Sequence, residues 1–108
     1  MDVGVTTGNP VIVFSGEIDL ATADGFLSAL MPYVEKGGPV PVDLSKVTFM
    51  DSTGIHAVFE AAQALGDRGC IIIHGAHDAI QKVFELTGLD AVTNIHIIPC
   101  RVLVDRAA

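Results

Sequence analysis

The sequence predicts a single α/β domain, residues 1–108, with a mixed, mostly parallel sheet of about five strands and helices packed against it. Short apolar runs alternate along the chain with segments whose apolar residues recur at helical spacing. Such alternation is typical of parallel sheets joined by right-handed helical crossovers. Half of the 108 residues are apolar, which is enough to form one hydrophobic core.

Two strands are expected near the N-terminus, at residues 3–6 and 11–14, with Gly8 and Asn9 in the turn between them. The second run, Val-Ile-Val-Phe, is apolar throughout. Uninterrupted apolar strands are common where helices cover both faces of a sheet, so we expect cover on both faces here.

The first helix is expected after Thr22, whose hydroxyl can cap it. Apolar residues follow at the spacing of one helical face, namely Leu27, Leu30, Met31 and Val34. Pro32 should kink or shorten this helix because proline lacks an amide hydrogen, and Gly37-Gly38 should end it. A strand is expected next at residues 40–44, although Pro41 removes one donor from its ladder.

A second helix is expected to begin near Ser52, and its apolar face is formed by Ile55, Val58, Phe59, Ala62 and Leu65. A strand at residues 71–73 follows. The third helix is expected from Asp78, with Gln81 completing a variant of the capping box and Gly88 as the C-cap. A last strand is expected at residues 95–98, and the tail beyond it shows no clear pattern.

Charge and composition exclude several classes of function. The chain has 13 acidic and 6 scattered basic residues, a formal charge of -7, so it lacks the basic patch that nucleic-acid binding requires. No apolar run approaches the roughly 20 residues that span a bilayer. There is no signal-peptide pattern, and two cysteines in such a chain are typical of reduced thiols. We expect a cytoplasmic protein that contacts neither nucleic acid nor membrane.

The segment from Val47 to Gly54 leaves a strand and opens a helix. Asp51 and Ser52 are both good N-caps because their side-chain oxygens accept free backbone N–H groups. A second interpretation makes Ser52 a phosphorylation site, since the N-terminus of a helix has unpaired donors and a partial positive charge that tolerate a dianion. The pattern alone leaves both interpretations open.

Three segments of the sequence resemble the landmarks of the STAS domain, and more narrowly those of bacterial anti-sigma factor antagonists. They are Gly-Glu-Ile-Asp at residues 16–19, the stretch from Val42 to Gly54 with its Phe-Met-Asp-Ser-Thr-Gly ending, and Leu-Thr-Gly-Leu at residues 86–89. The Asp-Ser-Thr-Gly element is the specific one. Departures from the family pattern are His56, where many relatives have a small residue, Pro41, and a short tail.

The resemblance implies a partner-switching role without catalysis. Such an antagonist binds an anti-sigma factor, itself an ATP-dependent serine kinase, and thereby frees a sigma factor for transcription. The kinase phosphorylates the serine after the aspartate, which breaks the complex, and a PP2C-type phosphatase restores it. Carried onto this chain, the acceptor is Ser52, with Thr53 as a secondary candidate. The implied partner-binding set is Asp19, Asp51, Ser52, Thr53, Gly54 and His56.

Other chemistry has weaker signals. Cys70, His74 and His77 match no standard zinc spacing, and no phosphate-binding glycine loop is present, so we expect neither metal nor cofactor. His56 lies four residues after Ser52, yet no nucleophile elbow or orienting carboxylate is recognisable, so we expect no enzyme activity. His56 is either a solvated side chain or a partner for a phosphate on Ser52.

Two alternative functions remain open from the sequence. One is a STAS subunit of a transport or stress-sensing complex, in which Ser52 is only a cap. The other is a thiol-based redox sensor that uses Cys70 or Cys100. The two cysteines are predicted at opposite ends of neighbouring strands, too far apart for the Cα separation of less than roughly 7 Å that a disulfide requires.

Overall fold

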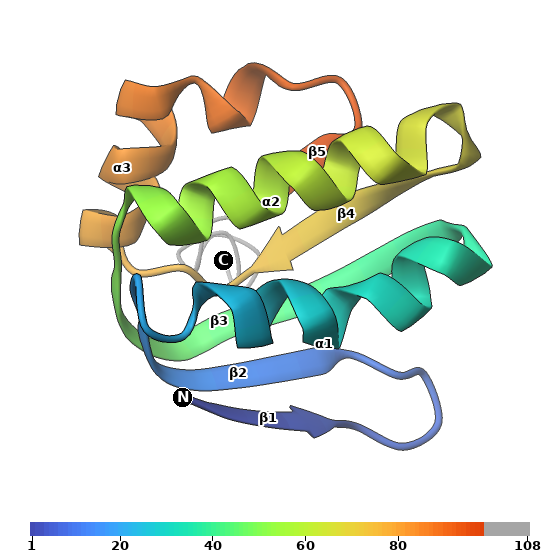
Figure 1. Ribbon diagram of the computed structural model, residues 1–108, viewed down its shortest axis with the longest axis horizontal. Helices are drawn as coiled ribbons and strands as arrows, with labels where there is room; N and C mark the ends of the chain where they lie inside the picture. The colour runs from blue at the N-terminus through green and yellow to red at the C-terminus, as the bar shows by residue number, and fades with distance from the viewer. Residues whose placement is uncertain (99–108) are drawn as a thin grey trace, which may run out of the picture.

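The computed structural model describes residues 1–98, and these form a five-stranded sheet in the order β1-β2-β3-β4-β5 (Figure 1). Strands β1 and β2 are antiparallel, and every other neighbouring pair is parallel. The predicted mixed, mostly parallel sheet is therefore confirmed. The strands are β1 (Asp2–Val5), β2 (Ile12–Ile18), β3 (Gly38–Met50), β4 (Gly69–His74) and β5 (Ile95–Ile98).

The three α-helices are α1 (Ala23–Lys36), α2 (Ser52–Leu65) and α3 (Asp78–Thr87), with short 3-10 turns at Gly66–Arg68 and Leu89–Ala91. From β2 to β5 the strand order runs in one direction, so right-handed crossovers place the connecting helices on one face of the sheet. Figure 1 shows α1 and α2 side by side over that face.

Cover on both faces was the wrong expectation for the part of the chain that the structure describes. Ile71 and Ile73 are buried beneath the helices, whereas Ile72 between them is only half-buried. The same alternation holds in β2, where Phe14 is buried and Val13 is half-buried. One face of the sheet therefore packs against the core. The apolar residues that alternate with the buried ones lie on the opposite face of the sheet, where they are partly exposed.

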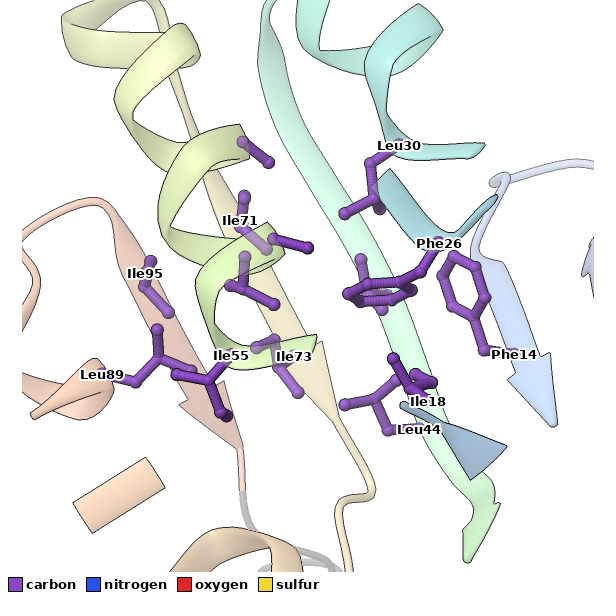
Figure 2. Close-up of a cluster of buried hydrophobic side chains, with 14 of the residues drawn as sticks. Phe14, Ile18, Phe26, Leu30, Leu44, Ile55, Ile71, Ile73, Leu89 and Ile95 are labelled. Atoms are coloured by element: carbon purple, nitrogen blue, oxygen red, sulfur yellow. The ribbon is translucent and has the colours of Figure 1, made fainter. Parts of the chain in front are cut away.

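The hydrophobic core fills the space between the sheet and the helices (Figure 2). Phe14 of β2 and Phe26 of α1 are fully buried and meet edge to face, with ring centroids 4.6 Å apart. Leu30 and Leu44 extend this cluster along α1 and β3. Within residues 1–98 no polar or charged side chain is buried, so the core depends on apolar packing alone.

Helix α1 and strands β2, β3 and β4 are longer than predicted. Helix α1 continues through Pro32 to Lys36, because Pro32 is exposed while Leu30 and Val34 pack into the core and offset the missing hydrogen bond. Strand β3 extends over 13 residues, well beyond the predicted 40–44. Register shifts opposite β2 change which residues of β3 face the helices, so no simple alternation marks its second half.

The start of α3 also differs from the prediction. His77 occupies the N-cap position and Asp78 is the first helical residue, so the expected capping box is not formed. Gln81 donates its side-chain amide to the Ala76 carbonyl oxygen at 2.9 Å. At the other end Gly88 caps the helix in the left-handed conformation, with φ of 79°, as predicted.

Candidate functional site

The loops after β2 and β3 lie side by side at one edge of the sheet. These strands are parallel neighbours, so their carboxyl ends meet, and the Asp51 N–H donates to the Ile18 carbonyl oxygen at 3.2 Å. Asp19 follows Ile18 directly. The carboxyl edge of a parallel sheet is where binding sites of α/β proteins usually form, and both predicted aspartates begin loops there.

Asp51 is the N-cap of α2. Its Oδ1 accepts the Thr53 backbone N–H at 2.9 Å and also a hydrogen bond from the Thr53 hydroxyl. The hydroxyl of Thr53 is the main cause that lowers the pKa of the Asp51 carboxyl below its ordinary value; backbone N–H groups add to the effect, and partial desolvation opposes it. Asp51 therefore fulfils the structural role that the sequence left open between Asp51 and Ser52.

The lowered pKa of Asp51 predicts a pH-dependent contribution to stability. Because the folded pKa lies below the unfolded one, the contribution is present above about pH 4 and is lost as the pH falls through the folded value. Asp51→Asn should therefore destabilise the protein at pH 6 and lose much of that effect at pH 3, as measured by urea unfolding at both pH values.

Thr53→Val is the matched variant, because it keeps the carboxylate but removes the hydroxyl hydrogen bond to it. The stability of Thr53→Val should still fall between pH 6 and pH 3, but by less than the stability of the parent. If the parent and Asp51→Asn differed in free energy of unfolding by the same amount at pH 6 and at pH 3, this account of the cap would be contradicted.

Of the two adjacent hydroxyl groups at the start of α2, the one on Ser52 is accessible from outside. It is the first residue of α2 and is exposed, and its Oγ makes no hydrogen bond to any residue in the range 1–98. The Thr53 hydroxyl, by contrast, is bound to Asp51. Adjacent helix N–H groups and the helix dipole favour negative charge at this position.

A surface groove of ≈ 470 Å³ runs beside Ser52 between α1 and α2. Ser52, Thr53 and His56, all expected at the site, lie along it, and so do side chains that the sequence did not single out. Leu20, 81% exposed, contributes apolar surface, and Asp24 and Glu60 contribute acidic groups. The groove is lined by Leu20, Ala23, Asp24, Leu27, Ser52, Thr53, His56, Ala57 and Glu60.

His56 is an exposed side chain whose ring is held by its own helix. Its Nδ1 lies 3.0 Å from Glu60 Oε1, one turn further along α2. Glu60 is thus the orienting carboxylate that was not recognisable in the sequence. The Ser52 hydroxyl makes no hydrogen bond to His56 within the described chain, so the contact between nucleophile and base that a hydrolase needs is not formed.

Asp19 and Gly54 occupy different surroundings from Ser52. The Asp19 carboxylate accepts the Ala21 N–H at 3.0 Å and the Thr22 hydroxyl at 3.3 Å, and it does not line the groove. Thr22 sits at the N-cap of α1 without a side-chain cap; its hydroxyl also donates to the Glu17 carbonyl oxygen. Gly54 is buried, where it lets the start of α2 approach the sheet closely.

The remaining candidates show no further site in the part of the chain that the structure describes. Residues 1–98 contain no group of three or more metal-ligating side chains, and none of their helices has the length and apolarity to cross a membrane. Cys70 is a half-buried free thiol on β4. Cys100 lies outside the described residues.

The protein is a small α/β domain with a surface groove and an exposed serine hydroxyl beside the N-terminus of α2. The chain belongs to the STAS domain family, whose family model matches residues 1–99. The anti-sigma-B factor antagonist of Listeria monocytogenes serovar 1/2a is 36% identical over 86 residues, which cover 78% of this chain and 75% of that protein.

Solved structures agree with this assignment. A crystal structure of an anti-sigma factor antagonist from Mycobacterium paratuberculosis is 26% identical, with a TM-score of 0.76, over 88% of this chain and 84% of the other. The Bacillus cell fate determinant SpoIIAA in its phosphorylated form is 18% identical, with a TM-score of 0.64, over 99% of this chain and 100% of the other. The second likeness concerns the fold, and both confirm the STAS architecture.

Proposed function

We propose that this chain is a cytoplasmic anti-sigma factor antagonist that has no catalytic activity and is switched off by phosphorylation of Ser52. Its partner is an anti-sigma factor with ATP-dependent serine kinase activity, and binding to it releases a sigma factor. A PP2C-type phosphatase returns the chain to its active form. The family and its antagonist relatives support this role.

The observation that carries the proposal is the difference between two adjacent hydroxyls. Ser52 is exposed and its Oγ makes no hydrogen bond within residues 1–98, whereas the Thr53 hydroxyl is bound to Asp51. A kinase can reach the first without breaking the cap of α2. Phosphorylation adds about -1.5 to -2 charges beside the groove, and this bulky, hydrated dianion must lose its water before a partner can pack closely there.

The partner surface of the proposal is the groove together with its rim. Leu20 supplies an exposed apolar side chain, and Asp24 and Glu60 supply negative charge on opposite sides of the groove. A partner with an apolar side chain beside a basic one complements this surface. Asp51 and Asp19 act indirectly, through the cap of α2 and the shape of the loop after β2.

Kinase treatment tests the phosphorylation site. Incubation with a cognate anti-sigma kinase and ATP should add one phosphate to the parent, as measured by intact mass. Ser52→Ala should remain unmodified because the acceptor oxygen is gone, while Thr53→Val should still accept one phosphate. A phosphate found on Ser52→Ala would show that another residue is the acceptor.

The same variants test the switch. Ser52→Asp should weaken binding to the anti-sigma factor by at least about tenfold, because a charge enters the contact surface, whereas Ser52→Ala should bind nearly as well as the parent. Calorimetric titration measures both. Equal affinities for Ser52→Asp and Ser52→Ala would rule out charge at this position as the switch.

A further inference from the structure

Ser52, His56 and Glu60 form one stripe along α2. They are spaced four residues apart, so each lies one turn from the next on the same side of the helix, and all three line the groove. Long helical side chains lean toward the N-terminus of their helix. Glu60 therefore reaches back to His56, and His56 lies one turn from Ser52 on the same stripe.

The contact with Glu60 fixes the chemistry of the His56 ring. Nδ1, 3.0 Å from Glu60 Oε1, is the donor of that pair. Nε2, on the other side of the ring, has no hydrogen-bond partner among residues 1–98. The side chain is 73% exposed, so nothing in the described chain blocks Nε2 from a new ligand beside it.

The surroundings of Ser52 are acidic. Asp24 faces the groove from α1, Glu60 faces it from α2, and the Asp51 carboxylate lies next to Ser52 in sequence. Of the side chains that line the groove, only His56 can carry a positive charge. A phosphate on Ser52 would carry up to two negative charges one turn away from His56, so a positive imidazole is the groove's own complement to it.

We infer that His56 is the internal counter-ion of a phosphate on Ser52, with Glu60 holding the imidazole in place between the two anions. The inference rests on the proposed phosphorylation of Ser52. In the phosphorylated chain the imidazolium donates Nδ1–H to Glu60 and Nε2–H to a phosphate oxygen. The phosphate is then held along α2, where it covers His56 and removes two residues of the partner surface at once.

The test uses chain into which phosphoserine is incorporated at position 52 during translation, so it needs no kinase. The midpoint of the phosphate titration, followed by ³¹P NMR, should be about half a pH unit lower in the parent than in His56→Gln, because a neighbouring cation stabilises the dianion. Equal midpoints in the two proteins would overturn the inference.

Imidazole ¹⁵N signals give an independent readout in the same samples. At pH 7 the signals of His56 should move toward those of the doubly protonated ring when Ser52 carries phosphate, while those of His96, exposed on β5, should not move. His56 signals that stay unchanged would overturn the inference. A kinase that fails to modify Ser52 would instead contradict the proposed function, and both NMR readouts would still decide the role of His56.

Discussion

Phe26→Ala is expected to destabilise the fold by about 3–5 kcal/mol, the range for emptying a buried aromatic site. Phe26 is fully buried where α1 meets the sheet, and its ring packs edge to face on Phe14 at 4.6 Å. Truncation leaves a cavity at the point where α1 is anchored. Urea unfolding monitored by circular dichroism measures the loss, and for a domain with stability in the usual range it is a large fraction of the total.

Phe49→Ala is the matched control, since it makes the same chemical change at a side chain that is 48% exposed on β3. It should cost less than about 1.5 kcal/mol, because little apolar surface is returned to water and no closed cavity forms. Similar losses for the two variants would mean that the contact of α1 with the sheet does not anchor the domain.

The helices were predictable where one strong period governs the sequence. In α2 the apolar face of Ile55, Val58 and Leu65 is buried as expected, because a 3.6-residue repeat sustained over 14 residues strongly favours an amphipathic helix. Strand β3 was predictable only over residues 40–44, because polar residues such as Lys46 interrupt its pattern beyond them and its second half is held by pairing with β2. Sheet pairing is a tertiary effect that a local pattern does not record.

The site was predictable only as far as it is contiguous in sequence. Ser52 and Thr53 lie in the first turn of α2 and His56 lies in the next turn, so one short sequence motif identifies all three. Leu20 and Asp24 reach the groove because α1 packs against α2, and no local signal in the sequence marks that packing. Glu60 was recognisable only as a polar-face residue, although its spacing of four from His56 was a usable signal.

Gly54→Ala is expected to destabilise the protein by about 1–3 kcal/mol, although alanine is the better helix former. A Cβ at this position would lie 2.8 Å from Ile18 Cγ2 and 2.8 Å from Met50 Cγ, both in buried side chains at the ends of β2 and β3. Such contacts force the N-terminus of α2 away from the sheet. Urea unfolding measures the stability, and the same displacement of Ser52 should weaken binding to an anti-sigma factor.

Gly25→Ala separates this close approach from helix propensity. Gly25 is exposed in α1, and a Cβ there would meet only Met1 Cε at an ordinary 3.7 Å. Its replacement should therefore stabilise the protein by about 0.5–1 kcal/mol, opposite in sign to the change at Gly54. If both substitutions stabilised the protein, the start of α2 would have room to spare, and the placement of the Ser52 hydroxyl would not depend on a glycine two residues away.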